Sequence, residues 1–339
     1  MEHSVSRVGR LRPQFGVTRR AMVKFLLKLA ISSILLALLL WRVPLGAIGA
    51  HLRSFGPSAL LAALVLSLTS WGVAAIRLWC LLPEFRYRDL LHATFVSRYY
   101  ATVLPGQIAG DVVKAYRLGR QSARAGRAEA ATAVDRGLGL FALFLLSATA
   151  SFYSTRVPLP LRLFFILGAI GVVVGGVVAS SRLFPLKAVE RLLSRRKSRI
   201  SAFIRDFSIA FHGHLRRPVM LVAAVMLGLV FHTGCVAMQV LLGNDLGMRL
   251  PWTDWTIVYA GVSLLMLLPI SVAGLGLREG GYVGLLALFG YKASTALSLS
   301  IAMFGISLVA TLVGGSLEFV AMVANARATR RPTGDSAER

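Results

Sequence analysis

The sequence predicts an all-α, polytopic membrane protein of about six to eight transmembrane helices, with two re-entrant or broken helix pairs in an inverted repeat. The observations behind this prediction are the composition, a series of long apolar runs and a motif that occurs twice. Hydrophobic residues make up 56% of the 339 residues and charged residues only 15%. A soluble domain of this length is rarely so apolar, so we expect an integral membrane protein.

Apolar runs divide the chain into expected helices and short connections. A run of about 20 residues can cross the hydrocarbon core of a bilayer as a helix. Runs of sufficient length lie at 24–43, 57–82, 128–153, 161–181, 218–242 and 293–323. A run at 253–269 is borderline, and one at 280–291 is too short to cross alone. The expected organisation is a basic segment 1–23, one membrane domain 24–325 and a disordered tail 326–339. The domain contains repeat halves at 57–153 and 218–323 and a linker at 182–217.

The positive charge indicates topology rather than nucleic-acid binding. Of the 38 Lys and Arg residues, 29 lie in segments 1–28, 83–127, 182–217 and 327–339, which alternate with poorly charged loops. This positive-inside pattern predicts a multi-pass protein of the cell inner (cytoplasmic) membrane with both termini in the cytoplasm. The net charge of +24 is then expected to attract membrane lipids with anionic headgroups. The other expected partners are a second copy of this chain, in a homo-oligomer, and envelope-biosynthesis enzymes.

A motif that interrupts the apolar pattern occurs at residues 104–114 and again at 268–278. Both copies read L-P-x-x-(I/V)-A-G-x-x-x-(K/R). Paired Gly/Pro-interrupted segments in corresponding halves point to a transporter's binding site. The offset of 164 residues also superimposes the flanking spans, and an odd number of crossings separates equivalent spans. We therefore expect inverted re-entrant pairs at 90–118 and 254–290; short or tilted crossings at 253–269 and 280–291 are the alternative.

The first copy of the motif carries polar residues suited to an anion. Asp111 and Lys114 are three residues apart and so share a helix face. The stretch between Gly106 and Gly110 precedes a helix start, whose free N–H groups favour phosphate. Arg117 continues this basic edge, although a solvated surface explains it equally well.

Two further positions in the spans carry charges. Asp135 and Arg136 are adjacent, so each is expected to meet a different partner, as a headgroup contact or as a structural ion pair. Glu318, deep in the last span, is interpreted as a proton-coupling group, a partner for a basic residue such as Arg136, or a side chain that snorkels to the interface.

The second copy combines small residues with an adjacent pair of opposite charges. Gly274 and Gly276 do not have dinucleotide-binding spacing, so they favour close packing of broken helices. Arg278 and Glu279 are expected to point into a polar cavity. The sequence shows no catalytic or metal-ligand constellation, so we expect no cofactor, no metal and no enzyme activity.

Residues 104–114 and 269–281 resemble the lysylphosphatidylglycerol synthase transmembrane (flippase-like) family, and the resemblance extends from about residue 24 to 325. The chain departs from the family pattern at Ala109, where glycine is frequent, and at Lys114, where arginine is common. The best-understood members join a lipid-flipping domain to an aminoacyl transferase. No such domain follows residue 323, so synthase activity is not expected. Carried over by position, the resemblance implicates Pro105, Gly106, Gly110, Asp111 and Lys114 in the first half, and Pro269, Gly274, Gly276, Arg278 and Glu279 in the second.

The leading functional prediction is a lipid translocator that moves an anionic or modified phospholipid, or a lipid-linked envelope intermediate, between leaflets. Lys114, Arg278 and Arg136 are the predicted headgroup ligands. Asp111, Asp135 and Glu318 are predicted to supply counter-charge or proton coupling. The alternatives are a membrane subunit or enzyme of envelope glycolipid or aminoacyl-lipid synthesis, and a non-transporting scaffold.

Overall fold

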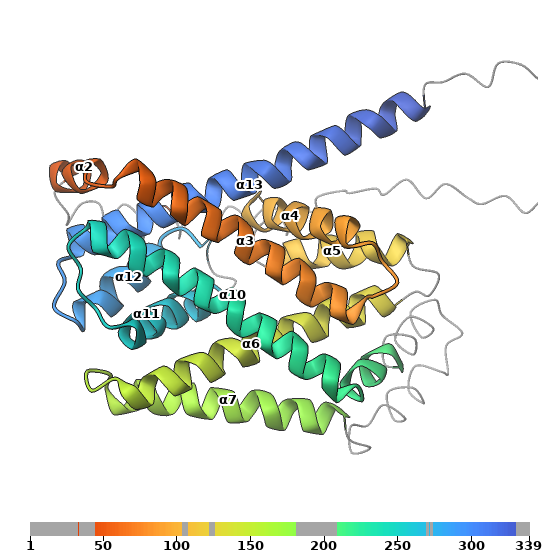
Figure 1. Cartoon of the computed structure of the whole chain (residues 1–339), viewed down its shortest axis with the longest axis horizontal. Coiled ribbons are helices and arrows are strands. Elements are labelled where there is room, and N and C mark those ends of the chain that lie inside the picture. The colour runs from red at the N-terminus through yellow and green to blue at the C-terminus, as the bar shows by residue number, and fades with distance from the viewer. Residues whose placement is uncertain are drawn as a thin grey trace, which may run out of the picture.

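The computed structural model is built from packed α-helices, with no strand among the residues that it describes (Figure 1). The described residues are 33, 45–103, 108–121, 126–180, 209–268, 271 and 274–329. Pro105, Gly106 and Pro269 of the two motifs lie outside them, as do segment 1–23, all of the expected span 24–43 except residue 33, most of the linker 182–217 and the end of the tail.

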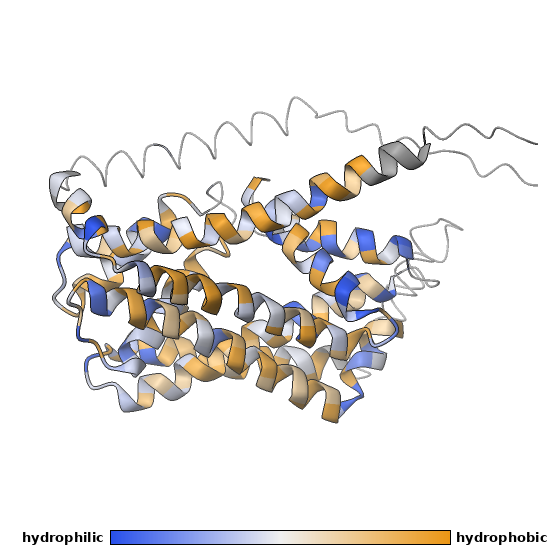
Figure 2. Ribbon diagram, turned by 45° about the horizontal axis from the view of Figure 1, so that its top comes forward, coloured by the Kyte–Doolittle hydropathy of each residue, from blue (hydrophilic) through white to orange (hydrophobic). Residues whose placement is uncertain are grey.

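Five helices in the described part of the chain are long and apolar enough to cross a membrane. Hydrophobic residues predominate along these helices (Figure 2). This arrangement confirms the prediction of a polytopic helical membrane protein. These helices are α3 (Pro57–Leu81), α6 (Arg127–Tyr153), α7 (Leu159–Ser180), α10 (Pro218–Asp245) and α13 (Ala293–Thr329).

The remaining helices are short, and four of them form two hairpins. A short helix α2 (Leu45–Arg53) precedes α3. Helix α4 (Tyr87–Val103) packs on α5 (Ile108–Gln121), and α11 (Trp252–Leu265) packs on α12 (Leu277–Ala287). At 1.5 Å per residue these four helices are roughly 16–26 Å long, which is shorter than the hydrocarbon core of roughly 30 Å.

The two hairpins have their outer ends at opposite ends of the bundle. The start of α4 and the end of α5 share a buried cluster with the end of α3 and the start of α6, through Leu90, Leu118, Leu82 and Ala128. At the other end of the bundle, a second buried cluster contains Trp255 from the start of α11, Leu286 from the end of α12 and Leu250 from the segment after α10. We call the first end the basic end, because the arginine-containing segments 82–88, 126–127 and 209–217 lie there, and the second the opposite end (Figure 1).

The packing of the helices repeats when the two halves are exchanged. Helix α4 packs on α13 just as α11 packs on α6, and α5 packs on α6 just as α12 packs on α13. Helices α3 and α10 pack on each other at the centre. The two helices run antiparallel: the start of α3 lies at the end of α10, where the Gly56 amide donates to the Asp245 carboxylate at 3.0 Å. The fold therefore contains the inverted repeat that the duplicated motif predicts.

Candidate functional site

A cavity of about 330 Å³ lies between the two halves of the bundle. Every helix of both repeats contributes to its wall, whereas α2 and α7 do not. Much of the wall is apolar or aromatic, but it also contains more positive than negative side chains. The charged residues in the wall are Arg77, Arg98, Asp111, Lys114, Asp135, Arg136 and Arg278. Five cations thus face two carboxylates, and the cavity has an excess of positive charge.

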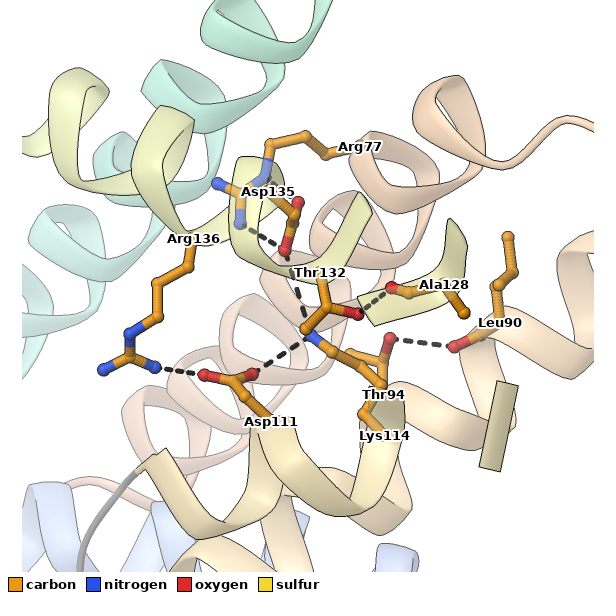
Figure 3. A network of polar contacts seen from close by, with 9 residues as sticks. All are labelled: Arg77, Leu90, Thr94, Asp111, Lys114, Ala128, Thr132, Asp135 and Arg136. Atoms are coloured by element: carbon orange, nitrogen blue, oxygen red, sulfur yellow. Dashed lines mark hydrogen bonds and ion pairs between the residues drawn. The ribbon is translucent and has the colours of Figure 1, made fainter. Parts of the chain in front are cut away.

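A connected ion-pair network occupies the part of the wall formed by α3, α5 and α6 (Figure 3). The guanidinium of Arg77 binds both carboxylate oxygens of Asp135, with N–O distances of 2.7 and 3.3 Å. The ammonium nitrogen of Lys114 lies 3.2 Å from Asp111 Oδ1 and 3.8 Å from Asp135 Oδ2. Arg136 donates to the other oxygen of Asp111. Three cations therefore share two carboxylates, a balance that compensates most of their charge.

The helical spacing of these residues explains how the network forms. Asp111 and Lys114 lie on one face of α5, as their spacing predicts, and this brings them close enough to form an ion pair. Asp135 and Arg136 are adjacent on α6 and project in different directions, Asp135 toward α3 and Arg136 toward α5. Lys114 and Asp135 are 7% and 5% exposed. Removing one member of such a buried ion pair leaves the other charge uncompensated and lowers the stability of the fold.

Arg278 has a different environment at the start of α12. It pairs with its neighbour Glu279, donates from Nε to the Ser300 hydroxyl at 3.3 Å, and lies 4.4 Å from the centroid of the Phe304 ring. Glu279 accepts a hydrogen bond from the amide of Gly276 at 2.6 Å and so caps the helix. Glu279 is not part of the cavity wall, whereas Arg278 is. Only one residue of this predicted pair therefore reaches the cavity.

The motif glycines shape the hairpins, and Gly110, Gly274 and Gly276 are not among the residues of the cavity wall. A Cβ on Gly110 would collide with the carbonyl oxygen of Ser97 and lie 2.9 Å from the Ala101 Cβ, so α5 can approach α4 closely only with glycine here. Gly274 and Gly276 have φ values of +74° and +81°, which L-residues with a side chain rarely adopt.

Glu318 and Arg117 form a separate cluster away from the cavity wall. Glu318 pairs with Arg117 and accepts a hydrogen bond from the Tyr100 hydroxyl at 3.1 Å. The basic partner of Glu318 is therefore Arg117 rather than Arg136, which is engaged by Asp111. The reason is packing: α13 lies against α4, next to α5, while Arg136 faces α5 from α6.

Two cavity cations, Arg77 and Arg98, are absent from the predicted site. Arg77 lies inside the apolar span 57–82, and a charge in such a span is by itself a signal of function. Arg98 lies in the approach to the first motif and looks like one more basic residue of a cytoplasmic segment. Only the folded chain reveals that it lines the cavity.

The cavity also contains polar groups that the fold satisfies internally. His232 lies 2.8 Å from the Tyr259 hydroxyl through Nδ1 and 2.9 Å from the carbonyl oxygen of Gly139 through Nε2. In the described residues, no three His, Cys, Asp or Glu side chains are grouped so that they could hold a metal ion.

A comparison with protein families gives one match that covers most of the chain. The family model described as the lysylphosphatidylglycerol synthase TM region matches residues 25–315. This range includes the first repeat, the second repeat up to residue 315 and all of the cavity wall. A search of curated proteins and a search of solved structures returned no match.

Proposed function

We propose, from the premise that this chain belongs to the lysylphosphatidylglycerol synthase transmembrane family, that it moves a lipid with an anionic headgroup between the two leaflets. The family and the apolar helices make it a multi-pass membrane protein of lipid or envelope metabolism. The transport role, the lipid and the membrane are our proposal.

The observation that carries the proposal is the positively charged cavity inside a bundle of apolar helices. Its wall combines five cations with two carboxylates. Charges in the membrane interior are costly and usually mark a substrate pathway or a relay. A volume of about 330 Å³ is at the small end of ligand pockets. It suits a headgroup, while the acyl chains would remain in the surrounding bilayer.

The two hairpins support a mechanism of alternating access. They approach the cavity from opposite ends of the bundle, and each contributes one motif cation, Lys114 or Arg278, to the wall. Inverted repeats of this kind can open a central site first to one side and then to the other. We propose that both hairpins are re-entrant. We further propose that the protein lies in the inner membrane of the cell. By the positive-inside rule, its basic end and both termini would then face the cytoplasm.

The test is leaflet-resolved transport of fluorescent phospholipids in proteoliposomes. The native protein should move phosphatidylglycerol, and Arg278→Ala should lower the rate by at least about tenfold, the effect of losing one charged hydrogen bond. Lys114→Ala should also lower the rate, because it leaves Asp111 and Asp135 with one counter-charge fewer in the cavity wall. Arg120→Gln is the matched control, since Arg120 is an exposed cation on the same helix as Lys114. Equal rates with native protein and with empty vesicles, across anionic, zwitterionic and glycosylated lipids, would contradict the proposal.

A further inference from the structure

Arg98 is the cavity cation whose charge is least compensated. Arg77, Lys114 and Arg136 share two carboxylates, and Arg278 has Glu279. Arg98, by contrast, has no carboxylate within ion-pair distance in the part of the chain that the structure describes. The network of Arg77, Lys114 and Arg136 spreads its excess positive charge over two carboxylates, whereas the charge of Arg98 has no carboxylate beside it in the described residues. Leaving a cation unpaired in a membrane interior costs free energy, so a ligand is the natural counter-ion.

The surroundings of Arg98 hold the guanidinium in place without neutralising it. Its Nη2 donates to the hydroxyl of Ser307 on α13, and its Cζ lies 4.8 Å from the centroid of the Trp71 ring on α3. The Nε atom is buried and has no hydrogen-bond partner. Guanidinium groups bind phosphate and carboxylate with two parallel N–H donors. Arg98 is thus fixed by neutral neighbours and still has donors to offer.

Arg278 faces the same cavity from the other half of the molecule. Arg98 lies on α4 of the first repeat and Arg278 on α12 of the second. Two positive charges in the wall of one cavity repel each other, and Arg98 and Arg278 both line it. An anion between them would remove this repulsion and would connect the two repeats through one ligand.

We propose that Arg98 and Arg278 form an oxyanion subsite that binds the phosphodiester of an anionic lipid headgroup. This inference deepens the proposed function, because it rests on lipid transport and names the group that is recognised. It assigns Lys114 to the ion-pair network that supports the wall, and assigns primary ligand binding to Arg98. It also sets a selectivity: a headgroup with a phosphodiester and no cation is preferred to one that carries an ammonium group.

The experiment is calorimetric titration of the purified full-length protein in detergent with dihexanoylphosphatidylglycerol. Arg98→Gln should weaken binding by roughly tenfold to a hundredfold, because one charge-assisted contact to the phosphate is lost. Arg98→Lys should weaken it less, since the charge remains but the two-donor geometry does not. Arg88→Gln is the matched control on the same helix, because Arg88 is exposed and outside the cavity wall.

Two further ligands define the chemistry. Dihexanoylphosphatidylcholine should bind more weakly than phosphatidylglycerol to the native protein, and this difference should shrink in Arg98→Gln. Inorganic phosphate separates the two sources of the same anion. Binding of phosphate as tight as that of the lipid would overturn the assignment to a headgroup.

The subsite and the proposed function can fail separately. If Arg98→Gln binds phosphatidylglycerol as tightly as the native protein, the subsite is wrong, even if the native protein transports lipids. If the native protein binds through Arg98 but moves no lipid in vesicles, the subsite is supported and the transport proposal is wrong. Thermal unfolding of Arg98→Gln checks its fold. We expect no loss of stability, since the replaced cation has no carboxylate partner to leave behind.

Discussion

The two copies of the motif place a cation at the same position and hold it in different ways. Lys114 lies on α5 between two carboxylates, Asp111 and Asp135, and connects its own helix to α6. Among the described residues, the carboxylate partner of Arg278 is Glu279, the next residue, which also caps α12. The first copy is therefore part of an ion-pair network that joins three helices, whereas the cation of the second copy is paired within its own helix and contacts α13 only through the neutral Ser300 and Phe304. One sequence pattern therefore places a cation in an interhelical ion-pair network in the first half and directly in the cavity wall in the second.

The largest expected difference between the two hairpins is the side of the membrane from which they can be reached. In a background without Cys80 and Cys235, Arg120→Cys at the end of α5 and Leu288→Cys after α12 should react with an impermeant thiol reagent from opposite sides. The expected result is all-or-none, because each hairpin begins and ends at one end of the bundle. Labelling of both positions from the same side would refute the inverted arrangement of the hairpins.

Loss of Asp135 should be the most destabilising single change in the cavity. Asp135→Asn leaves both Arg77 and Lys114 without a full counter-charge in a buried position. Breaking a buried ion pair typically costs about 3–5 kcal/mol of folding free energy. Thermal unfolding in detergent measures the effect. The matched control is Glu84→Gln, which breaks a half-exposed pair with Arg127 and should cost less than about 1 kcal/mol. Equal effects of the two variants would show that the network does not hold the helices together.

Glycine positions separate close packing from simple helix propensity. Gly110→Ala should destabilise the protein by about 1–3 kcal/mol, because its Cβ meets the backbone of α4. Gly280→Ala, in α12 of the second hairpin, has no atom within 4 Å of the added Cβ. It should be neutral or stabilise by up to about 1 kcal/mol. Unfolding temperatures of the two variants that shift in the same direction would contradict the close approach of α4 and α5.

The smallest expected effect concerns the Glu318 cluster. Arg117 is 31% exposed at its side chain, so Glu318→Gln should cost only about 1 kcal/mol. A double-mutant cycle is more informative than either change alone. The effects of Glu318→Gln and Arg117→Gln should be non-additive, while those of Glu318→Gln and Arg136→Gln should add. The reverse pattern in unfolding free energies would restore Arg136 as the partner.

The amino-acid sequence by itself determined the features that depend on local spacing. Apolar runs specify which helices can lie in a bilayer, and the Gly/Pro-containing motifs specify where the short helices break. The pairing of Asp111 with Lys114 follows from one helical turn, and the divergence of Asp135 and Arg136 follows from their adjacency. The inverted repeat follows from counting crossings between equivalent spans.

Only the tertiary structure decided which side chains meet across helices. Arg77 and Asp135 are 58 residues apart, and Glu318 and Arg117 are 201 apart, so no local period predicts either pair. In the sequence, Arg98 resembles any basic residue near a helix end. In the structure, α3 and α13 pack against it with neutral side chains, Trp71 and Ser307. The physical reason is that helical periodicity fixes the face on which a residue lies, while the packing of helices fixes what that face meets.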